Sequence, residues 1–157
     1  MLVMGILNVT PDSFADGGRY NDFESAIRRG NEMISEGVDI IDIGGESTKP
    51  GAERITLDEE LNRVIPVVKE LSQSGVRISI DTMRSEVARQ AIEAGASIIN
   101  DVSGGLADTE MLPTAASLEL PYIAMHWRGH SKDMNSRAVY KDVVSEVIIE
   151  IEERITA

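Results

Sequence analysis

The sequence has 157 residues and no cysteine, and its 27 acidic against 15 basic side chains give a formal net charge of −12. With 42% hydrophobic and 27% charged residues it can form one folded domain, 1–157, with a substantial core, while the lack of cysteine excludes disulfides, thiolate metal sites and a cysteine nucleophile. The acidic excess argues against a nucleic-acid partner, and since neither an apolar run of about 18 residues nor a signal peptide is present, we expect a cytoplasmic protein with no membrane contact.

Five short runs rich in Val and Ile predict β-strands buried on both faces, as in a parallel sheet. They are residues 2–9, 38–43, 76–80, 96–99 and 122–125. Between and after them, apolar side chains at helical spacing predict five helices, within 23–34, 57–71, 87–92, 111–118 and 140–155. Gly37, Gly75 and Gly95 stand where the first three helices are expected to end. Pro66 is expected to kink or divide the second helix.

A strand followed by a helix is thus repeated five times, which indicates parallel strands joined by right-handed crossovers. Two α/β architectures remain open at this point: a small doubly wound sheet of flavodoxin type, and the first five βα units of a (β/α)8 TIM barrel. A complete barrel needs about 250 residues. Because the last helix reaches Thr156 and Ala157 without a capping signal, we expect a truncated barrel chain.

Polar side chains stand at the carboxyl end of every predicted strand. These residues are Asn8, Asp42, Asp81, Asn100 with Asp101, and His126. In parallel α/β proteins these ends face the active site, whereas the alternative is that such residues cap the following helices. We expect capping from Ser85 and Asp58, which directly precede helical patterns, and ligand-facing roles for Asp81 and Asn100, whose helices begin several residues later.

Two loops at these strand ends have unusual compositions. Residues 8–18 are small and polar and contain a Gly pair, which predicts a mobile lid with Phe14 as its apolar side chain. Residues 44–51 combine glycine backbone amides with hydroxyl groups and the charge of Lys49, which suits an anion such as phosphate. Neither loop has the spacing of a nucleotide-binding motif.

Other chemistries find little support in the sequence. His126 and His130 have no standard zinc spacing, and no Gly-x-Ser-x-Gly motif of a serine hydrolase is present. Trp127 either stacks on a planar ligand or packs within the fold. The acidic side chains of the last predicted helix are expected to face solvent; they are Glu146, Glu150, Glu152 and Glu153.

Five segments in this order resemble the family of dihydropteroate synthases. They are GILNVTPDSF at 5–14 with DGG at 16–18, GGESTKPG at 44–51, ISIDT at 78–82, INDVSG at 99–104 and MHWRG at 125–129. The resemblance spans essentially the whole chain and implies a TIM-barrel enzyme of folate biosynthesis. Such enzymes join 6-hydroxymethyl-7,8-dihydropterin diphosphate to 4-aminobenzoate, with Mg²⁺, and release diphosphate; sulfonamides occupy their aminobenzoate site.

The resemblance also implies roles for individual residues. Asp81 and Asn100 match positions that hydrogen-bond the pterin, and Asn8 matches the position associated with Mg²⁺ and the diphosphate. Catalytic positions are implied for Asn8, Asp16, Thr48 and Lys49, and substrate-binding positions for Phe14, Thr48, Pro50, Asp81, Asn100, Val102 and His126. The full-length form is expected to be a homodimer.

The sequence departs from the family pattern in two respects. Lys49 stands where the family usually carries Arg, which keeps the charge but loses the bidentate fork. The chain does not reach the family's later motifs, an Asp in a Gly-rich stretch, Ser-Arg-Lys and Arg-x-His, so we expect these residues alone to be inactive. Two alternatives remain: a half-barrel that binds a pterin or a partner without catalysis, and a pterin-dependent methyltransferase, which resembles this chain at Asp81 and Asn100 but lacks the loops 8–18 and 44–51.

Overall fold

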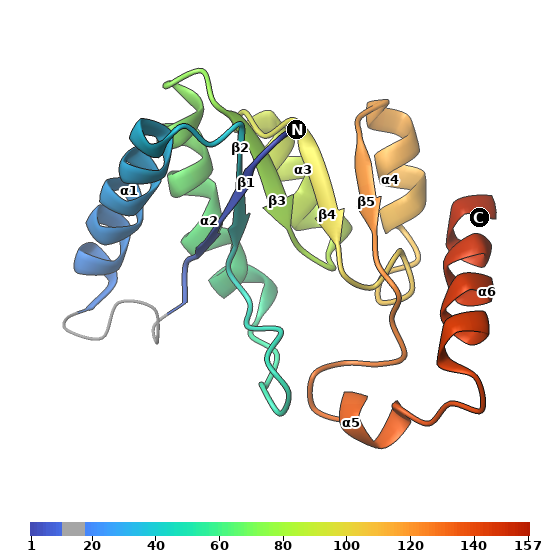
Figure 1. Ribbon diagram of the computed structural model, residues 1–157. Helices are drawn as coiled ribbons and strands as arrows, with labels where there is room; N and C mark the ends of the chain where they lie inside the picture. Colours follow the sequence, from blue (N-terminus) through green and yellow to red (C-terminus); the bar gives the residue numbers. More distant parts are fainter. Residues whose placement is uncertain (11–17) are drawn as a thin grey trace.

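Five parallel strands form one sheet in which each strand lies beside its neighbour in sequence (Figure 1). The computed structural model describes residues 1–10 and 18–157, and of residues 18–22 only the backbone. The strands are β1 (Met4–Asn8), β2 (Ile40–Gly44), β3 (Arg77–Asp81), β4 (Ile98–Asp101) and β5 (Tyr122–Ala124). The helices are α1 (Gly18–Glu36), α2 (Leu57–Ser72), α3 (Ser85–Glu93), α4 (Met111–Leu118), α5 (Met134–Arg137) and α6 (Val143–Thr156).

The strand order decides between the two architectures that the sequence left open. A doubly wound sheet reverses its order at a switch point, so that helices cover both faces. Here the order is β1-β2-β3-β4-β5, and α1 packs on α2, α2 on α3 and α3 on α4 along one face of the sheet. Sequential parallel strands with helices on one side form the wall of a (β/α)8 barrel. The flavodoxin-type alternative was therefore wrong, and the prediction of a partial barrel is confirmed.

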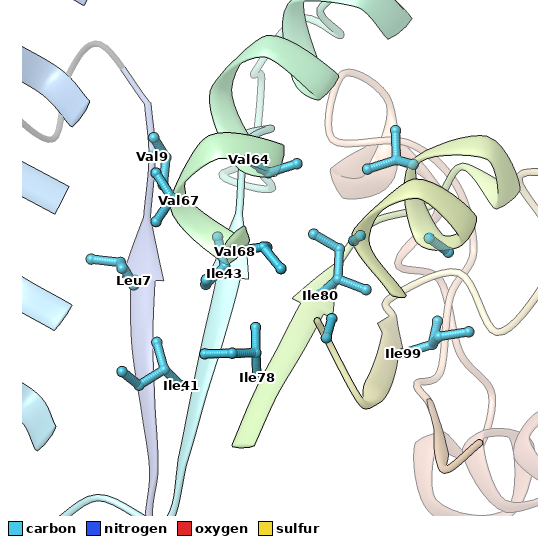
Figure 2. Close-up of a cluster of buried hydrophobic side chains, with 14 of the residues drawn as sticks. Leu7, Val9, Ile41, Ile43, Val64, Val67, Val68, Ile78, Ile80 and Ile99 are labelled. Carbon is cyan, nitrogen blue, oxygen red and sulfur yellow. The ribbon is translucent and has the colours of Figure 1, made fainter. Parts of the chain in front are cut away.

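The hydrophobic core fills the space between the sheet and the helices (Figure 2). Strand side chains that face the helices, such as Leu7, Ile41 and Ile80, are almost wholly buried and belong to the same cluster as Val64 and Val68 of α2. Because strand side chains alternate between faces, the intervening residues point to the opposite, inner face. The prediction of strands buried on both faces was wrong for β1, whose Ile6 is 64% exposed on that inner face.

The helix ends were predicted only in part. Gly37, Gly75 and Gly95 follow α1, α2 and α3 with positive φ, as expected, and α2 continues through Pro66 as one helix. Both capping predictions were wrong. Thr56, not Asp58, caps α2 by accepting a hydrogen bond from the Glu59 amide at 3.2 Å.

Ser85 does not cap α3, because it is already the first residue of that helix. Its backbone amide donates instead to Oδ2 of Asp108, at 2.7 Å. Asp108 comes from the segment between β4 and α4, so the cap is supplied by a distant part of the chain.

The chain after β5 differs most from expectation. The short helix α5 was not predicted, and α6 begins at Val143 rather than near Tyr140. Arg128 attaches α6 to the segment after β5: its guanidinium bonds Glu146 at 2.7 Å and Glu150 at 3.1 Å, and lies 3.9 Å from the centre of the Tyr140 ring. The expected solvent exposure is confirmed for Glu152 and Glu153, whereas Glu146 and Glu150 are half-buried in these contacts. Within the ranges that the structure describes, no helix has the length and apolarity needed to cross a membrane.

Candidate active site

Three of the residues singled out in the sequence lie in one row at the carboxyl end of the sheet. Asn8 pairs with Gly44 in the register of β1 and β2, Gly44 with Asp81, and Asp81 with Asn100. Four adjacent strands at the usual spacing span about 14 Å, which is the scale of a small ligand. Loops leave the sheet at this same edge, the lower one in Figure 1, so the row forms the floor of a candidate site.

Asp42 joins this row through Asn100. The Asn100 Nδ2 atom donates to Oδ2 of Asp42 at 2.9 Å, although β3 lies between their strands. In a barrel wall the tilt of the strands brings side chains of alternate strands to one level, which explains why residues of β2 and β4 meet. Asp42 is 4% exposed. Its Oδ1, the Asn100 Oδ1 and the Ser79 Oγ are buried without a hydrogen-bond partner, so polar atoms at this floor are left for a ligand.

Asp81 stands close to the backbone of β2, because residue 44 has no side chain. A Cβ at Gly44 would lie 3.2 Å from the Asp81 Oδ2 atom. Burial raises the pKa of Asp81 to about 7, and repulsion from the Asp42 carboxylate adds to the effect. Near neutral pH the Asp81 carboxyl is therefore protonated in some molecules and ionised in the others. A ligand that donates N–H groups favours the ionised form.

The outer part of the loop between β2 and α2 faces solvent, whereas Glu46 at its start is buried. Thr48, Lys49 and Pro50 are exposed at its outer part. The Gly51 amide donates to the Ser131 carbonyl at 2.7 Å, which joins this loop to the segment after β5. The Thr48 hydroxyl and the Lys49 charge are thus exposed on this loop, and their role toward an anion stays a prediction.

A sequence profile described as pterin binding enzyme matches residues 4–157. The chain belongs to the pterin-binding enzyme family. It is 51% identical to the dihydropteroate synthase of Mycobacterium leprae over 146 residues, which are 92% of this chain and 51% of that protein. The chain therefore spans about half the length of this relative.

Solved structures agree with the assignment to the pterin-binding family. The Xanthomonas albilineans dihydropteroate synthase with 4-aminobenzoic acid matches with a TM-score of 0.89 and 46% identity, over 99% of this chain and 55% of that one. The same enzyme in complex with 7,8-dihydropteroate matches with a TM-score of 0.83 and 42% identity, over 99% and 53%. The five strands thus correspond to about half of a known pterin-binding fold.

The other predicted site residues that the structure describes, Val102 and His126, differ in their surroundings. Val102 is half-buried after β4, and His126 after β5 places its Nε2 atom 2.7 Å from the Glu150 carboxylate of α6. The Trp127 ring meets the His130 ring edge-on, with their centres 5.1 Å apart, and this contact leaves both alternatives for Trp127 open. Their roles toward a ligand stay predictions.

Two predicted residues, Phe14 and Asp16, lie outside the described residues, as does most of the predicted lid. In the part of the chain that is described, no three His, Cys, Asp or Glu side chains gather where they could hold a metal ion.

Two polar residues at the floor of the candidate site were missed in the sequence analysis. Asp42 was noted at a strand end without a role, and Ser79 was not considered. Both interrupt runs of isoleucine in buried strands, and a polar residue in such a run is a signal that could have found them. The ion pairs around Glu60 and Arg84 have no such signal, because their partners are 24 residues apart.

Proposed function

We propose that this chain carries the pterin-binding part of a dihydropteroate synthase. The observation that supports this most directly is the polar floor of Asp42, Asp81 and Asn100 in a chain 51% identical to a protein of that name. A pterin ring edge presents N–H donors and nitrogen acceptors side by side, and carboxylate and amide groups can match both. Asp81 and Asn100 are proposed to bind this edge, with Asp42 orienting the Asn100 amide.

The diphosphate of 6-hydroxymethyl-7,8-dihydropterin diphosphate is proposed to lie toward the loop after β2. Thr48 can donate a hydroxyl hydrogen bond and Lys49 a positive charge, and both are exposed there. In a chain with a net charge of −12, a local cation is needed to hold an anion. Pro50 is proposed as part of the wall against 4-aminobenzoate.

Among the described residues, Asn8 offers an oxygen atom that suits Mg²⁺. Asn8, exposed at the end of β1, supplies a hard amide oxygen, and Mg²⁺ commonly takes only one or two protein ligands beside phosphate oxygens and water. Asn8 is therefore proposed to hold Mg²⁺ together with the diphosphate. When bound, the ion neutralises charge on the leaving group.

The proposed reaction breaks the bond between the pterin methylene carbon and the diphosphate oxygen, and forms a bond from that carbon to the amine of 4-aminobenzoate, which loses a proton. Positive charge develops on the methylene and spreads into the ring. Asp81 and Asn100 would hold the ring in line, and Lys49 and Thr48 would stabilise the leaving oxygen. Because the chain spans about half of its relatives, turnover is proposed for a complete barrel and pterin binding for these residues.

Calorimetric titration of the 157-residue chain with 6-hydroxymethyl-7,8-dihydropterin, with its diphosphate and with methyltetrahydrofolate tests this function. We expect both pterins to bind, the diphosphate more tightly with Mg²⁺ present, and Asp81→Asn to weaken both by about tenfold because it replaces an acceptor with a donor. Asp58→Asn, an exposed acid away from the floor, is the control. Preference for methyltetrahydrofolate with no gain from the diphosphate would instead support the methyltransferase alternative.

A further inference from the structure

Arg84 contacts both ends of the loop between β2 and α2. Its Nη1 atom donates to Oε2 of Glu46 at 2.8 Å, where the loop begins, and its Nη2 atom donates to the carbonyl of Ile55 at 2.6 Å, where the loop ends. Residues 47–54 lie between these two contacts. A single guanidinium thus closes the loop at its base.

A buried carboxylate holds this guanidinium in place. Glu60 of α2 is 1% exposed, and it forms an ion pair with Arg84 and accepts a hydrogen bond from the Thr82 hydroxyl at 2.6 Å. The hydroxyl oxygen of Thr82 in turn accepts from the Arg84 amide at 3.1 Å. Because Thr82 directly follows Asp81, these contacts connect the floor of the site to the loop that carries Thr48.

The charges in this group are balanced. Glu46 and Glu60 contribute two carboxylates, and Arg54 adds a second guanidinium by bonding Oε1 of Glu46 at 3.0 Å. Removing one member of such a buried group leaves a partner without its counter-charge, which is costly. The group could serve only to hold α2 on the sheet, but that would not require a bond to Ile55 and to the Glu46 side chain at the two loop ends.

We propose that Arg84 is a positioning residue for the diphosphate-binding loop. By closing residues 47–54 at their base, it holds the exposed Thr48 and Lys49 at a fixed place relative to Asp81. A loop ordered before binding loses less conformational entropy when the anion arrives. The inference rests on the proposed function, since it assigns the diphosphate to this loop.

The test compares two ligands on Arg84→Lys, which keeps the charge but cannot reach Glu46, Glu60 and Ile55 together. Calorimetry gives the affinity for 6-hydroxymethyl-7,8-dihydropterin and for its diphosphate, and their ratio measures the contribution of the loop. We expect pterin affinity to stay within about twofold and the ratio to fall about tenfold, as for one lost hydrogen bond to a charged group. Arg89→Lys is the matched control, because Arg89 is an exposed residue of α3 that pairs with Glu86 and Glu93 of the same helix.

A second variant, Glu46→Gln, and a second measurement, cleavage by trypsin, distinguish the positioning role from a folding defect. Trypsin cleaves after Arg54, beside the carbonyl that Arg84 holds, so cleavage there should be severalfold faster in Arg84→Lys and Glu46→Gln and unchanged in Arg89→Lys. An unchanged ratio, or an equal loss for both ligands, overturns the positioning role while leaving the proposed function intact. If the unaltered chain binds neither ligand, the proposed function fails and the positioning role with it.

Discussion

The side-chain amide of Asn100 on β4 donates to the carboxylate of Asp42 on β2, 2.9 Å away and across β3. This bond turns the Nδ2 atom of Asn100 toward Asp42, so the Oδ1 atoms of both side chains are left as acceptors. A ligand with adjacent N–H groups is matched by such a pair. The bond therefore orients the floor of the site before a ligand arrives.

Removing this donor should destabilise the protein. In Asn100→Ala the buried Asp42 carboxylate loses the one donor shown for it, and we expect the free energy of unfolding to fall by about 1–3 kcal/mol at pH 7. Urea unfolding followed by Trp127 fluorescence measures this. Adding Asp42→Asn to Asn100→Ala removes the unpaired charge and should recover part of the loss. If Asn100→Ala alone unfolds like the unaltered chain, the bond contributes nothing to stability.

The raised pKa of Asp81 makes stability depend on pH in a definite direction. Its folded value of about 7 lies above the ordinary value of 3.8, so between these pH values the folded chain keeps a proton that the unfolded chain has lost. The free energy of unfolding therefore falls as pH rises from about 4 to about 7, and stays lowered above that, by about 1.4 kcal/mol for each unit of the shift.

Asp81→Asn should remove this dependence. We expect the variant to gain stability over the unaltered chain at pH 8 and to gain much less at pH 5, in urea unfolding at both values. Asp58→Asn, whose carboxylate is exposed, serves as the control and should show no such change. A gain that is the same at pH 5 and pH 8 would contradict the assigned pKa.

The affinity for a pterin should also depend on the ionisation of Asp81, but it should rise with pH, whereas the free energy of unfolding falls. Because the ionised Asp81 is the better acceptor for ring N–H groups, binding of 6-hydroxymethyl-7,8-dihydropterin should strengthen between pH 6 and pH 8. Calorimetry on Asp81→Asn should show a weak affinity that is flat over this range. Parallel pH profiles for the two chains would mean that another group governs binding.

Two adjacent glycines should respond differently to alanine. A Cβ at Gly44 meets the Asp81 carboxylate at 3.2 Å, whereas a Cβ at Gly45 meets Cγ1 of the fully buried Val64 at 2.7 Å. Gly44→Ala should weaken pterin binding severalfold with a small change in stability, because the carboxylate must shift. Gly45→Ala should cost about 1–3 kcal/mol of stability, because it overpacks the core. Calorimetric titration and urea unfolding of both variants measure pterin affinity and stability. Equal losses of affinity and of stability in the two variants would contradict the assignment of Gly44 to the site and Gly45 to the core.

The start of α2 offers a test of the observed cap. Thr56→Ala removes the hydroxyl that accepts from the Glu59 amide and should lower the free energy of unfolding by about 1 kcal/mol. Asp58→Ala, in the first turn of the same helix, loses only a favourable interaction with the helix dipole and should cost about half as much or less. Thermal unfolding of the two variants measures the difference, and a larger loss for Asp58→Ala would reverse the roles.

Local patterns along the chain were enough to predict the repeated strands and helices, the glycines that end three helices, and the row of Asn8, Asp81 and Asn100. Side-chain periodicity and turn chemistry act over a few residues, so they can be read along the chain. The row follows as well, because parallel strands that end in polar residues bring those ends to one edge of the sheet. The resemblance to dihydropteroate synthases led to the family that the profile match shows.

The way in which these elements meet could not be predicted from such local patterns. The sequential strand order, the bond from Asn100 to Asp42 over 58 residues, and the bond from Arg84 to Glu46 over 38 residues have no local signature. The same holds for the Asp108 carboxylate at the start of α3. Such contacts depend on strand tilt and on the docking of one loop against another, and these are set by packing of the whole sheet and its helices rather than by neighbours in the sequence.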